Sequence, residues 1–419
     1  MEEGLKVERE TFAPLALSEI SKNLIELFFT SEILKKETFS RAKPRAVKET
    51  TVIGTARNMK SIIRAFSAMM ADFENVKRRS RLTDREIALK MDRVTYTTEM
   101  DGLSRSDFVI EAVSEDPKIK QAVYTQLEEH LTEDAIVATN TSSLSITDLV
   151  ADTVHPERFV GMHFFNPVAK MPLVEVIAGA KTNAKTIATV VDLTKKLGKT
   201  PIKVKECAGF LVNRTLLPYL NEAAKMFEEG ESVEHIDQVL KAFGMPMGPF
   251  TLADEVGLDI GKKVSDILFE SYGERMQPSP LLAQMTEKNW LGKKTGKGFY
   301  LHQGKQQTFN TGVQSLQCGK AVLDKQTILD RAILIMVNEA SRCLEEKVVA
   351  NARYLDMAMV MGTGFPAFRG GLLRYADSLG IAEVVKRLSE FETHYSERFR
   401  VSGLLLKMLE KKQTFYGNM

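Results

Sequence analysis

Cysteine is scarce in this sequence, with three residues among 419. Cys207, Cys318 and Cys343 lie far apart and form no Cys-x-x-Cys pattern. The sequence therefore predicts neither a zinc-type metal site nor a disulfide framework. Widely spaced, unpaired cysteines are typical of a reducing compartment, so we expect a cytoplasmic protein.

Long apolar runs are also lacking. No apolar segment reaches the length needed to span a bilayer, and residues 1–4 do not begin a basic stretch followed by an apolar one. We therefore expect no integral membrane segment and no secretory signal peptide. The hydrophobic share of 44% and the charged share of 27% are typical of a globular chain with a sizeable core.

A strong excess of one charge is absent as well. Because 57 Lys and Arg residues stand against 55 Asp and Glu residues, the formal net charge is only +2. This balance gives no reason to expect nucleic acid or an anionic membrane as a partner. Short basic clusters such as residues 77–79 are expected to be solvated.

Strand-like and helix-like segments alternate through the first half of the sequence. The segments that we predict as strands are residues 50–54, 94–98, 108–113, 136–139, 159–165, 173–177 and 201–204. Between the first two, an apolar stripe from Ile62 to Val76 predicts a long amphipathic helix. Thr83 followed by Glu86 predicts a capping box at the start of another helix. This alternation favours an α/β fold with a mostly parallel, doubly wound sheet.

The second half of the sequence reads as helical and repeats itself. Residues 213–223 resemble residues 330–340, and residues 298–300 resemble residues 414–416. Two helical modules related by duplication are the simplest explanation. We expect four parts in all: an N-terminal helix and linker (1–49), the sheet domain (50–207) and the two helical modules (208–305 and 306–419).

The strongest local signal lies between Phe159 and Ile177, where two apolar segments flank a loop with prolines at both ends. If the segments pair as antiparallel strands about Ala169, His163 and Glu175 face each other, because each is six residues from that centre. A carboxylate beside an imidazole fixes the tautomer of the ring and stabilises the imidazolium, as a general base requires. The alternative is a histidine that is simply satisfied within a core.

A run of short polar side chains begins at Asn140, directly after the apolar segment 135–139. Ligands of parallel sheets bind outside the carboxyl ends of the strands, so Asn140 and Ser142 could hydrogen-bond a small polar substrate. Ser145 followed by Asp148 also fits a helix cap, and both roles can hold together.

Asn213 stands where the sheet pattern gives way to the helical pattern. An asparagine buried there could bridge the two domains or touch a substrate. Helix capping or a hydrogen bond between helices is the more common role for such a residue, and the sequence leaves both open.

Five motifs occur in one order: NTSS, GMHFFNP, LVEVI, GFLVNR and GKKTGKGFY, which begin at residues 140, 161, 173, 209 and 292. In this order they resemble 3-hydroxyacyl-CoA dehydrogenase. The duplicated helical half resembles the α subunit of the bacterial multifunctional β-oxidation complex, and residues 4–10 resemble the end of its enoyl-CoA hydratase region. The resemblance implies a shortened Rossmann-like domain followed by two duplicated all-helical modules, without the hydratase domain.

The resemblance also assigns roles. His163 would be the catalytic base and Glu175 its partner. The residues that would bind substrate are Ser142, Asn166 and Asn213. The residues that would contact the cofactor are Gly54, Glu115, Lys120, Asn140 and Lys294. The implied reaction moves a hydride from C3 of a 3-hydroxyacyl-CoA to NAD, while the base takes the hydroxyl proton, and the product is a 3-ketoacyl-CoA.

Partners follow from the same resemblance. We expect an acyl-CoA substrate, and either a thiolase subunit or a second copy of the chain as a protein partner. Two alternatives are a cofactor-deficient remnant that binds acyl-CoA or serves a structural role, and a helical interaction module without catalysis.

The sequence departs from the family directly after residues 50–54. Gly54 should open a GxGxxG loop, but Ala56 and Met59 stand where the second and third glycines belong. By comparison with the family, roughly one helix and one strand, on the order of 25–30 residues, are missing. We therefore expect an impaired NAD site, because its phosphate-binding loop region is absent.

The acid that binds the ribose hydroxyls should lie about 20 residues beyond the loop. Asp72 and Glu74 lie near that distance, but they fall within the amphipathic helix and are expected to face solvent. The sheet could close over the gap if residues 94–98 paired directly beside residues 51–54, with the helices between them forming one right-handed crossover.

Overall fold

The computed structural model describes residues 7, 10–12, 14–54, 59–80, 82–100, 102–304 and 306–417. The chain forms two compact units. Residues 38–198 make up the sheet unit, and residues 1–37 together with 199–419 make up the helical unit. None of the helices in the described part of the chain is long and apolar enough to cross a membrane.

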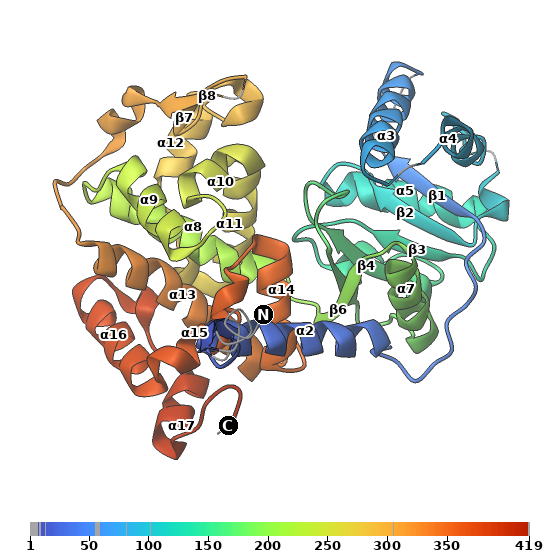
Figure 1. Cartoon of the computed structure of the whole chain (residues 1–419). Coiled ribbons are helices and arrows are strands. Elements are labelled where there is room, and N and C mark those ends of the chain that lie inside the picture. The colour runs from blue at the N-terminus through green and yellow to red at the C-terminus, as the bar shows by residue number, and fades with distance from the viewer. Residues whose placement is uncertain are drawn as a thin grey trace. The chain divides into compact units, whose positions relative to one another are not determined.

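The main sheet confirms the predicted α/β class. Its strands, in spatial order, are β1 (Thr50–Gly54), β2 (Phe108–Ala112), β3 (Ile136–Thr139), β4 (Phe159–Phe164), β5 (Leu173–Ala178) and β6 (Thr200–Lys205). Strands β1 to β4 run parallel to one another, and β5 runs antiparallel to β4 (Figure 1). The carboxyl ends of β1 to β4 therefore share one edge, where parallel sheets bind ligands.

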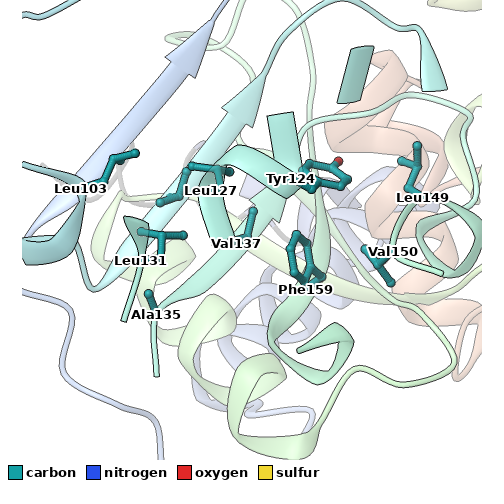
Figure 2. Packing of buried hydrophobic residues seen from close by; sticks show 10 residues of the cluster. Leu103, Tyr124, Leu127, Leu131, Ala135, Val137, Leu149, Val150 and Phe159 are labelled. Carbon is teal, nitrogen blue, oxygen red and sulfur yellow. The ribbon is translucent and has the colours of Figure 1, made fainter. Parts of the chain in front are cut away.

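Helices cover both faces of this sheet. Those of the sheet unit are α3 (Met59–Ser80), α4 (Asp84–Met91), α5 (Pro117–His130), α6 (Ile146–Leu149) and α7 (Ala184–Lys196). On one face, α5 packs in a buried cluster with the three central parallel strands; Figure 2 shows Tyr124 beside Phe159 there, with ring centroids 5.1 Å apart. On the other face, α7 supplies Ile187, Val190 and Val191. Burying each such large side chain stabilises the fold by roughly 1.5–3 kcal/mol.

Two predictions concern the segment between β1 and β2; one is correct and the other is wrong. The capping box is confirmed: the Thr83 hydroxyl accepts from Glu86 N–H, and the Glu86 carboxylate accepts from Thr83 N–H. The strand predicted at residues 94–98 is wrong, since no strand forms there. β1 pairs with β2 and is the last strand of the described sheet, but residues 94–98 do not add to its outer side. Instead, the Tyr96 ring packs edge-on against Phe66 of α3, with centroids 5.4 Å apart.

The helical unit can be described along the two predicted modules, whose bounds remain a prediction; the first is not all-helical, because it holds a two-stranded sheet. The first holds α8 (Val212–Glu228), α9 (Val233–Phe243), α10 (Pro249–Val256), α11 (Leu258–Tyr272), α12 (Leu281–Glu287), β7 (Tyr300–Gln303) and β8 (Gln306–Phe309). The second holds α13 (Lys325–Glu345), α14 (Ala352–Thr363), α15 (Leu372–Leu379), α16 (Ile381–His394) and α17 (Gly403–Lys411). The N-terminal α2 (Glu19–Lys36) belongs to the same unit and contacts α14.

The duplication is visible in reciprocal ion pairs between α8 and α13. Arg214 Nε donates to Glu339 at 2.8 Å, and Arg331 Nε donates to Glu222 at 2.7 Å. Both arginines and Glu222 are fully buried. Each arginine also pairs with the C-capping glutamate of the opposite helix. The same bonds therefore occur twice, with the two helices exchanging roles.

A second repeated feature is an aspartate that accepts hydrogen bonds from two backbone N–H groups at the end of its module. Asp254 accepts hydrogen bonds from the two N–H groups of residues 299–300, at 2.9 Å each. Asp377 accepts from those of residues 415–416, at 2.9 and 3.1 Å. The repeated tails thus make equivalent contacts, which supports a shared origin of the modules.

Candidate active site

The His163–Glu175 pair lies on neighbouring antiparallel strands. The two residues are directly opposite in the register of β4 and β5, as the sequence predicted. His163 Nδ1 is 2.7 Å from Glu175 Oε2; the glutamate side chain is fully buried and the histidine side chain is 8% exposed. Because a carboxylate only accepts, Nδ1 carries the hydrogen of this bond and Nε2 lies on the opposite side of the ring. The pair can therefore accept a proton at Nε2 and stabilise the resulting charge.

The turn after β4 adds two features. The Phe165 ring packs on the His163 imidazole, with centroids 4.5 Å apart and planes tilted by 50°. Asn166, predicted to bind substrate, follows in the same turn and is exposed to solvent. It lies three residues beyond the histidine, at the edge of the sheet where β4 ends.

The polar run after β3 holds the carboxylate of Glu115. Oε1 of Glu115 accepts from Thr141 Oγ1 at 2.6 Å, and from both Ser142 N–H at 2.8 Å and Ser142 Oγ at 3.1 Å. Ser143 Oγ lies at 3.4 Å. The structure therefore brings together one residue predicted for substrate and one predicted for the cofactor, which lie 27 positions apart in the chain.

Asn140 links two strand ends. Its N–H donates to the Glu111 carbonyl at 2.7 Å, and its side-chain Oδ1 accepts from Phe164 N–H, next to His163, at 3.2 Å. The predicted cap also forms, because the Ser145 hydroxyl accepts from Asp148 N–H at 3.1 Å. Asn140 thus braces the segment that carries the histidine; its predicted contact with a cofactor remains a prediction.

A buried carboxylate next to this polar run was not predicted from the sequence. Glu111 of β2 accepts from Lys120 Nζ at 2.8 Å, Tyr124 Oη at 2.8 Å and Thr139 Oγ1 at 2.7 Å. The Glu111 and Lys120 side chains are both fully buried. Burial of Tyr124 beside this carboxylate raises the pKa of its phenol. A charged residue in the middle of an apolar strand was the available signal, since such residues are almost never fully buried unless paired.

Lys120 therefore has a different neighbourhood from the one that the resemblance implied. Its ammonium forms the ion pair with Glu111 and also lies 3.5 Å from the Asn140 carbonyl oxygen. In this arrangement it supports the polar run from within the protein. A direct contact with a cofactor remains a prediction.

The other predicted residues fall elsewhere. Asn213 is the second residue of α8, and Lys294 pairs with Asp259; both predicted residues belong to the helical unit. Gly54 ends β1, where an added Cβ would have only the Ala112 carbonyl oxygen within reach, at 4.0 Å.

The predicted departure from the phosphate loop falls partly outside the described residues. Ala56 lies among residues 55–58, outside them, and α3 begins at Met59. Asp72 is exposed and Glu74 is half-exposed on α3, as expected for helix residues. No acid therefore ends a strand beside β1 in the described part of the sheet.

The fold and the site together define a class: a Rossmann-like sheet with a buried histidine–glutamate pair and a second, mainly helical unit. Residues 38–207 match the family model described as 3-hydroxyacyl-CoA dehydrogenase, NAD binding domain. Residues 209–302 match the model of the C-terminal domain of the same dehydrogenase. The chain belongs to the 3-hydroxyacyl-CoA dehydrogenase family.

Similar proteins extend this result. A fatty acid oxidation complex subunit alpha from Shewanella amazonensis is 40% identical over 445 positions, which cover 99% of this chain and 63% of that protein. The crystal structure of 3-hydroxybutyryl-CoA dehydrogenase from Escherichia coli superimposes with a TM-score of 0.77 at 25% identity, covering 88% of this chain and all of the other. (S)-3-hydroxybutyryl-CoA dehydrogenase from Ralstonia eutropha gives 0.59 at 34% identity, covering 62% and 100%. The chain thus spans less than two thirds of the length of the first relative.

Proposed function

We propose that this chain oxidises 3-hydroxyacyl-CoA to 3-ketoacyl-CoA with NAD. The observation that carries the proposal is the 2.7 Å contact between His163 and the buried Glu175, at the ligand-binding edge of a sheet of this family. The name of the Shewanella relative supports an acyl-CoA substrate from fatty-acid oxidation.

In the proposed reaction, His163 acts through Nε2. It accepts the proton of the C3 hydroxyl as the C3–H bond breaks, and Glu175 at Nδ1 stabilises the imidazolium. By the family resemblance, Ser142 would bind the oxygen at C3, and Asn166 and Asn213 remain predicted substrate-binding residues. NAD, when bound, supplies the acceptor for the hydride.

The described residues suit the nicotinamide end of NAD better than its adenosine end. Near the histidine, Glu115 is held in place by three side chains of the polar run, as a contact to the nicotinamide end would require. At the adenosine end, β1 is the last strand of the described sheet, so no strand brings an acid to the ribose hydroxyls. The Shewanella alignment spans 445 positions and this chain has 419 residues, a difference of 26, which supports a missing segment. We therefore propose weakened NAD binding.

The test is NADH binding by titration calorimetry, with reduction of acetoacetyl-CoA followed in the same sample as loss of NADH absorbance. Saturable binding with turnover supports the dehydrogenase. A chain that melts cooperatively and binds acetoacetyl-CoA, but neither binds NADH nor turns over, excludes it. An unfolded sample is recognised by its melting curve and is set aside.

The unpaired outer side of β1 favours a second candidate, an acyl-CoA-binding protein without hydride transfer. In that case acetoacetyl-CoA binds with the same affinity whether or not NAD is present. A dehydrogenase instead binds the two ligands with positive or negative coupling, because both meet at one site.

A protein partner is proposed on the subunit name of the relatives. We infer that the helical unit assembles with a thiolase subunit. Size-exclusion chromatography of the mixed proteins tests this, and unchanged elution volumes would count against it.

A further inference from the structure

Helices α8, α10 and α11 enclose a cavity within the first helical module. Both α10 and α11 contact α8 (Figure 1). The cavity has a volume of about 40 Å³, and its lining includes Leu217, Leu220, Ala224, Phe250, Gly261 and Phe299. A single water needs about 10–15 Å³, so the space suffices for about three groups of that size.

The cavity is long and narrow. Leu217 and Ala224 lie at its wall and are separated by about 10 Å along the axis of α8. A volume of about 40 Å³ spread over that length leaves the width of a channel. Val256, at the end of α10, also lines the channel and is 46% exposed, so the channel reaches the protein surface there. This shape suits an unbranched chain better than a ring.

The described residues that line the channel are apolar except for Asn221 and Ser265. The Asn221 amide donates to the Gln277 carbonyl at 2.9 Å and accepts from Ser279 N–H at 2.7 Å, so it is already bonded within the module. Ser265 is buried. A hydrocarbon is therefore the kind of ligand that this lining favours, because apolar cavities bind apolar groups.

Asn213, which is predicted to bind substrate, lies on the side of α8 that lines the cavity. Asn213, Leu217, Leu220 and Ala224 recur at helical spacing and so share one face of the helix. The wall of the cavity therefore begins one helical turn, about 5.4 Å, beyond Asn213. A substrate bound at Asn213 would have an apolar channel along the same helix.

The second module differs from the first at the cavity. An added Cβ at Gly261 would meet nothing within 4 Å. When the repeated segments 254–257 and 377–380 are aligned, Gly261 of α11 corresponds to Val384 of α16, which is fully buried. The duplicated fold thus accepts a valine at this position. The module that contains Asn213 is the one that keeps a glycine there.

We propose that this channel holds the alkyl end of the acyl group and gives the chain a preference for acyl groups longer than butyryl. The inference rests on the proposed function, because it concerns the tail of the same acyl-CoA substrate. Each methylene that leaves water for the channel should tighten binding about fourfold, so about three of them should tighten it roughly fiftyfold.

The test is a series of straight-chain esters, butyryl-, hexanoyl-, octanoyl- and decanoyl-CoA, titrated calorimetrically into the full chain without NAD. Wild-type affinity should rise by roughly fiftyfold along the series. Gly261→Val, which introduces the residue of the second module, should reduce this gain to less than about threefold, because the valine side chain occupies the channel. Glu270→Val places the same side chain on an exposed position of α11 and is the matched control, with the full gain expected.

Gly261→Ala adds a single carbon and should remove about fourfold of the gain, which tests the channel even if the valine variant fails to fold. Equal affinities for all four esters in the wild-type chain would overturn the proposal. A full gain in a Gly261→Val chain that melts cooperatively would overturn it as well, and would mark the cavity as a packing defect. A preserved gain without any acetoacetyl-CoA turnover would refute the dehydrogenase and support the channel, whereas turnover with a flat series would do the reverse.

Discussion

Glu175 is fully buried and its Oε2 lies 2.7 Å from Nδ1 of the His163 ring, so the carboxylate is positioned to act on that ring. Hydrogen bonding to the imidazolium favours the charged form of the histidine during proton transfer. The alternative of a merely structural histidine predicts a different response to mutation, because a structural pair contributes to folding and not to turnover.

The first prediction concerns His163. We expect His163→Gln to lower kcat by about a hundred- to ten-thousandfold, since glutamine fills similar space but accepts no proton. Binding of acetoacetyl-CoA, measured by calorimetry, should change little. Loss of binding together with an early thermal transition would instead identify the histidine as a core residue.

The second prediction concerns the buried Glu111–Lys120 ion pair. Glu111→Leu leaves an ammonium buried without its counter-charge, which should lower the free energy of unfolding by about 3–5 kcal/mol. The double variant Glu111→Leu with Lys120→Met removes both charges and should recover most of that loss. Urea unfolding of both variants measures this, and a double variant as unstable as the single one would refute the charge argument.

These two pairs show what the sequence can and cannot predict. His163 and Glu175 lie on strands joined by a short loop, so their register follows from counting residues about the loop centre. Glu111 meets Thr139, 28 residues later, and Lys120, one helix away. Those contacts depend on how parallel strands and a crossover helix pack, which spacing alone does not specify.

Helices and strands also differ in how well the sequence predicts them. All six strands of the main sheet were predicted from short segments bounded by turn residues, and β2 to β5 are apolar runs that are largely buried on both faces. The segment 94–98 has the same β-prone composition but does not pair with the outer side of β1, and it packs through Tyr96 against α3 instead. The repeat in the sequence predicted two modules, but not that their first helices would exchange buried ion pairs.

The third prediction follows from that exchange between α8 and α13. Arg214→Leu and Arg331→Leu should each destabilise the helical unit by about 3 kcal/mol, and by similar amounts, because each removes the closest arginine of a buried glutamate. Glu339 then keeps Arg275 and Arg342, and Glu222 keeps Arg398. Lys407→Ala breaks an exposed pair and is the control, with an expected loss under about 1 kcal/mol. Markedly unequal losses for the two arginines would contradict equivalent roles.

The fourth prediction concerns Asp356 of α14. Burial raises its pKa to about 7 from an ordinary value of 3.8, although Leu373 N–H, Arg374 N–H and the Tyr416 hydroxyl all donate to it and oppose the rise. Between those two pH values the folded chain holds a proton that the unfolded chain lacks. Unfolding therefore releases a proton, and the contribution of this group to stability falls as pH rises from about 4 to about 7.

Asp356→Asn removes this titration. Free energies of unfolding in urea, measured at several pH values, should show a flatter slope for the variant than for the wild-type chain between about pH 4 and pH 7. Parallel curves would mean that the carboxyl is ionised throughout, held by its three donors.

The whole molecule combines the buried His163–Glu175 pair with a sheet whose last described strand is β1. In dinucleotide-binding sheets, the glycine-rich turn approaches the pyrophosphate, and the neighbouring strand supplies the acid for the ribose. These are separate contributions to affinity. If the proposed loss of both is right, NADH affinity should respond differently when each is restored, and this separates a defective loop from a missing strand.

The fifth prediction is that Ala56→Gly alone changes NADH affinity by less than about threefold, because it removes a Cβ and adds neither the strand nor its acid. Inserting after Gly54 the segment of the Shewanella relative that would fill the proposed gap should raise affinity by about a hundredfold or more, since it would supply the turn, the strand and the ribose contact together. The insertion with its acid replaced by alanine is the matched control and should recover only part of the gain. If Ala56→Gly alone restored tight binding in calorimetry, the turn would be the defect, and the sheet ending at β1 would have to bind adenosine without its missing strand.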